Sequence, residues 1–123
     1  MYHLLAALLH LAHPVTLHTG IATTFNIPEL DPWNVGGFAC EGRVKLTPLQ
    51  RKLIASGAVV AHKTLDCGEV ILVCVPRVAS CALALVWDRG PRVALLDLWH
   101  DLSKLLKHNG KEPIVAFTFT RGV

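Results

Sequence analysis

The sequence has few charged residues, no low-complexity tract and no internal repeat. Charged residues make up 17% of its 123 positions and hydrophobic residues 52%, a balance that excludes an intrinsically disordered chain. The length fits one domain with its own core and is too short for two. The net charge of +3 comes from scattered lysines and arginines without interleaved aromatic residues. This pattern argues against nucleic acid as a partner and is compatible with polyanionic surfaces such as cell-wall polymers.

The cysteines and histidines are not spaced as zinc ligands usually are. The cysteines form no CxxC pair, and no histidine lies at zinc-finger spacing from them. We therefore expect neither a metal site nor another cofactor. An even number of cysteines favours two disulfides and an oxidising, extracytoplasmic setting. Four buried free thiols in a reducing cytoplasm are the alternative. The residues concerned are Cys40, Cys67, Cys74 and Cys81.

The N-terminal segment lacks the features of a typical signal peptide. No Lys or Arg precedes the apolar run Leu4–Leu11, His10 interrupts it, and no clear A-x-A site follows. The run is too short to span a bilayer. We expect residues 1–15 to form an apolar helix or arm that packs on the domain formed by residues 16–123 or on a neighbouring chain. Protein partners or self-association would use this arm, and a poorly recognised export signal is the alternative.

The first half of the domain predicts a strand, a loop and a short helix. β-Branched residues and alternation over Thr16–Phe25 are typical of a strand. Two prolines and a Gly-Gly pair in Asn26–Gly37 predict a loop, in which Trp33 either fixes the loop or stacks on a sugar ring. Thr47-Pro48-Leu49-Gln50 predicts a capped helix start, with the helix running to residue 53 or 54.

The middle of the chain predicts a hairpin. Its strands are Val70–Val75 and Ala82–Trp87, joined by a turn at Pro76–Ala79. Cys74 and Cys81 flank that turn at positions that can face each other across the ladder, which suits a disulfide. Cys40 would then pair with Cys67 and hold the segment around His62 in place.

The last third predicts strand, helix, strand. Arg92–Leu96 is an expected short strand, and Asp97 is a natural N-cap for a helix over Leu98–His108 that ends at Asn109-Gly110. The expected apolar face of that helix consists of Leu98, Leu102, Leu105 and Leu106. Alternation over Pro113–Thr120 predicts the closing strand. Several short strands and one late helix in so small a chain indicate a compact, mainly β barrel.

Six motifs follow one another in an order that is specific. They are His18–Phe25, with a G-x-A-[ST] core; Ala39-Cys40 with Leu46-Thr47-Pro48; Val60–Gly68; Cys74…Cys81; Asp88-Arg89-Gly90-Pro91; and Leu96-Asp97-Leu98. In this order they resemble the rare lipoprotein A-like double-psi β-barrel family, which is related to the expansin, barwin and lytic transglycosylase A barrels. The resemblance covers about residues 18–120.

The resemblance implies a six-stranded double-psi β-barrel with one or two short helices, preceded here by the apolar arm. It also implies action on, or binding to, peptidoglycan glycan strands, and the family's enzymes are lytic transglycosylases. Such an enzyme needs one acid with a raised pKa near a groove. Asp88 is the candidate acid, and His62 would orient it or contact substrate. The remaining predicted substrate-binding residues are Trp33, Glu41, Arg89 and Asp97, of which Glu41 and Asp97 are candidate second carboxylates.

Three functional hypotheses follow. The first is peptidoglycan cleavage with Asp88 as the acid, and the second is a non-catalytic barrel that binds glycan strands. The third is a structural or interaction module of a larger assembly, such as a phage virion or tail, which would place the chain in a virion. A structural interpretation of Asp88, in which it caps the turn or pairs with Arg89, also stays open.

Overall fold

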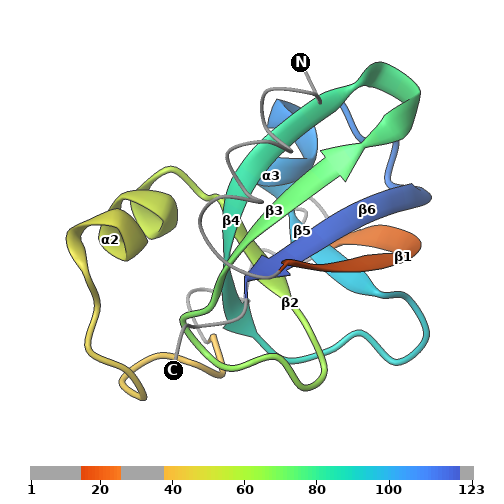
Figure 1. Ribbon diagram of the computed structural model, residues 1–123. Helices are drawn as coiled ribbons and strands as arrows, with labels where there is room; N and C mark the ends of the chain where they lie inside the picture. Colours follow the sequence, from red (N-terminus) through yellow and green to blue (C-terminus); the bar gives the residue numbers. More distant parts are fainter. Residues whose placement is uncertain (1–14, 26–37, 120–123) are drawn as a thin grey trace.

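The computed structural model describes residues 15–25 and 38–119. The predicted N-terminal arm and the predicted loop that contains Trp33 lie outside the described residues. Six strands close into a barrel in the order β1-β5-β2-β4-β3-β6 (Figure 1). Their bounds are β1 Val15–Phe25, β2 Val59–Ala61, β3 Val70–Val75, β4 Ser80–Asp88, β5 Leu96–Trp99 and β6 Lys111–Phe119. The expected mainly β barrel of six strands is confirmed.

The barrel mixes parallel and antiparallel neighbours. β1 runs parallel to β5 and β2 runs parallel to β4, whereas the other four contacts are antiparallel. Alternation directs one face of each strand inward, as with Ile114 and Ala116 of β6 and Leu96 and Leu98 of β5. The inward side chains form one continuous apolar core.

The predicted helix start at Thr47 is confirmed. Helix α2 covers Pro48–Ala55, and Thr47 forms a capping box with Gln50. The Thr47 hydroxyl accepts from the Gln50 amide at 3.2 Å, and the Gln50 Oε1 accepts from the Thr47 amide at 2.7 Å. The Gln50 Nε2 also donates to the Gly68 carbonyl at 2.7 Å, which ties α2 to the loop before β3.

The predicted hairpin and both disulfides are present. β3 and β4 pair with Cys74 directly opposite Cys81, and the short 3-10 helix η1, Pro76–Val78, joins them. Disulfides link Cys74 to Cys81 and Cys40 to Cys67. All four cysteines are therefore paired, which excludes the interpretation with free thiols.

The strand predicted over Arg92–Leu96 and the helix predicted to begin at Leu98 are wrong in their bounds. Residues 92–95 form bends, and β5 begins only at Leu96 and includes Asp97. Asp97 is not an N-cap, because β5 is paired on both sides: Asp97 lies opposite Thr23 of β1 and Ala61 of β2. Sheet pairing between distant segments therefore overrides the local capping preference of aspartate.

Helix α3 is correspondingly shorter than predicted, from His100 to Leu105. It ends in a Schellman arrangement at Lys107, which has a φ of 57°, rather than at Asn109-Gly110. The Lys107 amide donates to the Lys104 carbonyl and the His108 amide to the Ser103 carbonyl. Leu105 does not join the buried face, since it is 65% exposed.

Gly20 permits the segment before β5 to lie close against β1. A Cβ atom at this position would lie 2.8 Å from the Cβ of Leu95, whose amide donates to the Ile21 carbonyl. We expect Gly20→Ala to destabilise the fold by about 1–3 kcal/mol, because both contacting atoms lie next to the backbone and cannot turn away. Urea unfolding would measure this loss. Thr19→Ala, at an exposed neighbouring position, is the control, and equal stabilities of the two variants would contradict the close contact.

An ion pair joins η1 to β6. Arg77 donates to both carboxylate oxygens of the buried Glu112, at 2.7 and 3.1 Å, and the Asn109 amide donates to the same group at 3.0 Å. Hydrogen bonding by Arg77 is the main cause that holds the pKa of Glu112 below its ordinary value. The stabilising contribution of this pair is therefore present at neutral pH and lost as the pH falls through the pKa of Glu112 in the folded state.

We predict that Arg77→Ala lowers the melting temperature at neutral pH, because it leaves the Glu112 carboxylate buried without its partner. In strongly acidic buffer, where Glu112 is protonated, the deficit should shrink. Thermal unfolding at both pH values measures the difference. Adding Glu112→Gln to Arg77→Ala should recover part of the loss at neutral pH. A deficit that is the same at both pH values would argue against this ion pair.

Candidate functional site

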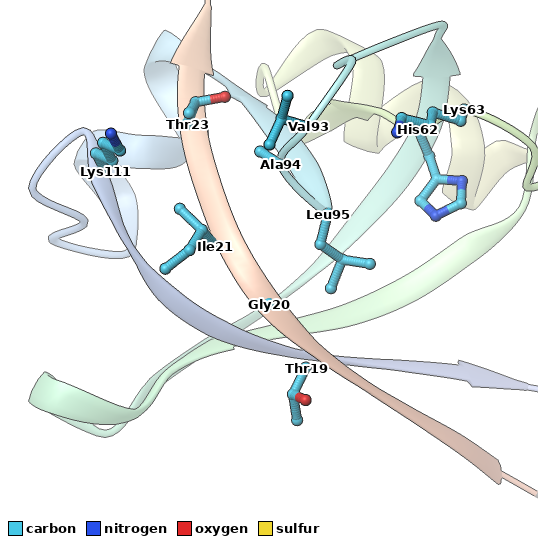
Figure 2. A pocket seen from close by; sticks show the side chains of 10 residues that line it. All are labelled: Thr19, Gly20, Ile21, Thr23, His62, Lys63, Val93, Ala94, Leu95 and Lys111. Atoms are coloured by element: carbon cyan, nitrogen blue, oxygen red, sulfur yellow. The ribbon is translucent and has the colours of Figure 1, made fainter.

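A groove lies on the outside of the barrel beside β1 (Figure 2). Its volume is about 720 Å³. Ile21 and Leu95 form its apolar middle, and Lys63 and Lys111 lie toward opposite ends. The complete lining is Thr19, Gly20, Ile21, Thr23, His62, Lys63, Val93, Ala94, Leu95 and Lys111. Polar groups and cations therefore surround an apolar floor.

Asp97 is not among the lining residues but contacts one of them, Thr23. Asp97 is half-buried, and the hydroxyl of Thr23 donates to its Oδ1 at 2.9 Å. Burial is the main cause that raises the pKa of Asp97 above its ordinary value. The hydrogen bond from Thr23 opposes this shift, and the negative charge of Asp88 adds to it. Asp97 therefore holds its proton to a higher pH than an ordinary aspartate.

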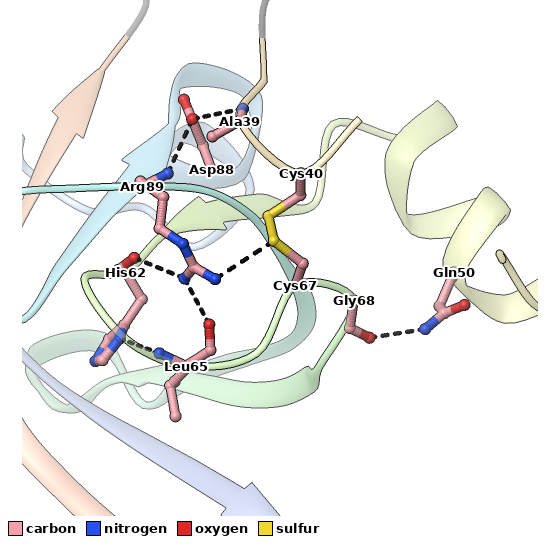
Figure 3. Close-up of a disulfide and its surroundings, with 9 residues drawn as sticks. All are labelled: Ala39, Cys40, Gln50, His62, Leu65, Cys67, Gly68, Asp88 and Arg89. Atoms are coloured by element: carbon pink, nitrogen blue, oxygen red, sulfur yellow. Dashed lines mark hydrogen bonds between the residues drawn. A yellow bond between two sulfur atoms is a disulfide. The ribbon is translucent and has the colours of Figure 1, made fainter. Parts of the chain in front are cut away.

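Asp88, the predicted acid, lies at the end of β4, where its carboxylate contacts the backbone. Its Oδ1 accepts from the amides of Ala39 and Arg89, both at 2.9 Å (Figure 3). The first contact ties the segment before Cys40 to the end of β4. This arrangement matches the interpretation in which Asp88 caps the turn.

Arg89 braces the loop after β2. Its guanidinium donates to the carbonyl oxygens of His62, at 3.2 Å, and of Leu65, and its Nη2 lies 3.4 Å from the Cys67 sulfur (Figure 3). The His62 amide in turn donates to the Asp88 carbonyl at 3.1 Å. The disulfide, Arg89 and the end of β4 therefore fix the loop that carries His62.

His62 presents a neutral imidazole to the groove. Its Nδ1 accepts from the amides of Thr64 and Leu65, each at 3.0 Å, so the ring hydrogen belongs on Nε2. Burial is the main cause that lowers the pKa of His62, and neighbouring positive charges on His18, Arg89 and Lys63 lower it further. At neutral pH the ring can therefore donate one hydrogen bond from Nε2 but carries no charge.

Of the two remaining predicted residues, the structure describes only Glu41. Glu41 is exposed in the turn after Cys40 and is not among the lining residues, and Trp33 lies outside the described residues. The sequence patterns did not single out Trp99, which follows Asp97 on the same side of β5. Its ring contacts Phe25 and Phe38, with centroids 5.3 and 5.0 Å apart.

Thr23, Lys63 and Lys111 were also missed as site residues. The alternation of side chains along β1 could have indicated Thr23. Its neighbour Ala22 points into the core, so Thr23 points outward. Adjacency to His62 was a signal for Lys63. No sequence signal indicated Lys111, because its place at the groove depends on its pairing with Thr23 across β1 and β6.

The part of the chain that the structure describes contains neither a metal-binding cluster nor a membrane-spanning helix. There, no three histidine, cysteine, aspartate or glutamate side chains lie close enough together to hold a metal ion. None of the helices in residues 15–25 and 38–119 combines the length and apolar character needed to cross a membrane. Neither models of known protein families nor curated proteins match this sequence.

Proposed function

We propose that this chain acts on peptidoglycan glycan strands as a lytic transglycosylase, with Asp97 rather than Asp88 as its acid. The observation that carries this proposal is the raised pKa of Asp97 beside the groove. A transglycosylase needs one carboxyl whose pKa is raised so that it can act as an acid, and the pKa of Asp97 is shifted in this direction. The sequence resemblance to the rare lipoprotein A-like family supplies the substrate class.

The same proposal includes a double-psi barrel in an extracytoplasmic setting. A closed six-stranded barrel with two parallel pairs, β1–β5 and β2–β4, supports this fold type. Two disulfides support an oxidising compartment. The order of motifs in the sequence supports both the double-psi barrel and the extracytoplasmic setting.

The proposed reaction uses one carboxyl twice, first as an acid and then as a base. Because Thr23 donates to Oδ1 of Asp97, the acidic proton is assigned to Oδ2. That proton passes to the glycosidic oxygen as the bond between this oxygen and C1 breaks, and the positive charge develops on the sugar ring. The Asp97 carboxylate then takes the proton of the C6 hydroxyl while O6 bonds to C1. An anhydro sugar forms, water is not consumed and Asp97 is protonated again.

His62 and Asp88 assist in different ways. The Nε2–H of His62 is available to a sugar hydroxyl or ring oxygen in the groove. Asp88 acts through its charge, which favours the protonated form of Asp97. The single-acid reaction needs no second carboxylate, so Asp88, whose Oδ1 accepts from two amides, is assigned no proton transfer in it.

Digestion of purified peptidoglycan sacculi, with soluble products identified by mass, tests this function. Anhydro-muropeptides are the expected products. Products with reducing ends would mean hydrolysis and would contradict the single-acid reaction. A folded chain that sediments with sacculi but releases nothing would leave only glycan binding. A chain that does neither would favour the structural module of a larger assembly.

A further inference from the structure

The outer face of the antiparallel half of the barrel is unusually apolar. Register places large apolar side chains side by side across β1, β6, β3 and β4, in the row Leu17, Phe117, Leu72 and Leu83. The next row contains Thr19, Val115, Cys74 and Cys81. We call these two rows the outer apolar face. An antiparallel sheet with one solvated face normally carries polar residues at such positions, so this face requires a covering layer.

The exposed fractions of the side chains differ between the centre and the margins of the outer apolar face. Leu72 and Cys74, in the centre of the outer apolar face, are only 5% and 1% exposed although they point away from the core. Leu17 and Leu83, at its two margins, are 57% and 40% exposed. A small hollow of about 230 Å³, lined by Cys74, Pro76, Val115 and Phe117, opens on the same face. The centre is therefore covered while the margins are accessible.

The described helices do not supply this cover. Helix α2 packs mainly against β4, and α3 packs against β5 and β1. Because Leu72 and Cys74 are buried within one chain, a second copy is not needed to cover them. A covering segment would therefore have to belong to the same chain.

Residues 4–11 have the required chemistry and position. They consist of leucine and alanine except for His10, and residues 1–14 contain no Lys, Arg, Asp or Glu. They end a few residues before Val15, which pairs with Phe119 at the edge of the outer apolar face. The face spans three strand spacings, about 14 Å, and eight residues span about 12 Å as a helix or about 26 Å when extended. We propose that residues 4–11 dock across the outer apolar face of their own barrel.

Photo-crosslinking in the full chain tests this docking. Leu83 is replaced by p-benzoylphenylalanine, because it lies at the margin of the face farthest from β1 and is accessible. The matched control places the same residue at Leu105, which is exposed on α3, away from β3 and β6. After irradiation, cross-linked peptides are identified by mass. Dye binding by a chain without residues 2–11 gives a second measurement.

From position 83 we expect cross-links within one chain to residues 2–11, at least about fivefold more abundant than from position 105. The truncated chain should bind several-fold more of a dye that detects exposed apolar surface. Cross-links from position 83 between two chains, or none to residues 2–11, would overturn the proposal. Unchanged dye binding by a folded truncated chain would overturn it as well. Neither result depends on whether the groove cleaves glycans.

Discussion

Asp97→Asn is expected to lower the rate of anhydro-muropeptide release by about 10²–10⁴-fold, because it removes the proton that the leaving oxygen requires. The amide oxygen of the variant can still accept from the Thr23 hydroxyl, so the local geometry should persist. Release of soluble products from sacculi over time measures the effect. Asp101→Asn, at an exposed carboxyl on α3, is the matched control and should retain full activity.

Loss of folding should not explain the loss of rate. The pKa of Asp97 is raised in the folded state, so its contribution to stability declines as the pH rises from the ordinary aspartate pKa to the folded value. At neutral pH, Asp97→Asn should therefore be at least as stable as the wild type in urea unfolding. An active Asp97→Asn variant would show that another group is the acid. Activity lost in Asp88→Asn alone would point back to Asp88.

Removing the disulfide between Cys40 and Cys67 has the largest expected effect on stability. It closes a sequence separation of 27 residues, against 7 for Cys74 and Cys81. Loop-closure entropy gives about 3.5 kcal/mol for the longer loop and about 2.4 kcal/mol for the shorter one. We therefore predict that Cys40→Ala/Cys67→Ala is less stable in urea unfolding than Cys74→Ala/Cys81→Ala.

This disulfide should also affect the groove. The Cys67 sulfur lies beside the Arg89 guanidinium, which holds the loop that carries His62. Cys40→Ala/Cys67→Ala should therefore lower activity even where the chain remains folded, whereas Cys74→Ala/Cys81→Ala should not. If the shorter loop proved the more stabilising one, or if both pairs changed activity equally, the role given to Cys40–Cys67 would be wrong.

Features with a local cause could be predicted from the sequence. The capping box at Thr47 needs residues three positions apart, and the pairing of Cys74 with Cys81 needs a short turn. Both were predicted correctly. β2 is only three residues long, so it carries little alternation by which a strand is recognised.

The environment of Asp97, the proposed acid, depends on contacts between distant segments and could not be predicted in this way. Asp97 has good N-cap chemistry, and only its pairing with β1 and β2 makes it a strand residue. Its hydrogen-bond partner Thr23 lies 74 positions earlier in the sequence. Burial, which sets the direction of its pKa, has no signature in the sequence around it. Asp88 was favoured because its motif is conspicuous, yet its carboxylate accepts from backbone amides.

Two substitutions should move the pKa of Asp97 in opposite directions. Asp88→Asn removes a negative charge and should lower it, while the new amide oxygen still accepts from Ala39 and Arg89. Thr23→Val removes a donor to the carboxylate and should raise it. An acid must be protonated to act, so the decline of activity at high pH should begin earlier in Asp88→Asn and later in Thr23→Val. The pH dependence of product release measures both shifts.

A carbon-13 NMR titration of the Asp97 carboxyl group in the folded wild-type chain tests the central claim most directly, because it requires no activity. We predict a pKa above the ordinary aspartate value, lowered by Asp88→Asn and raised by Thr23→Val. A wild-type pKa at or below the ordinary value, unchanged by either substitution, would contradict the assignment of Asp97 as the acid.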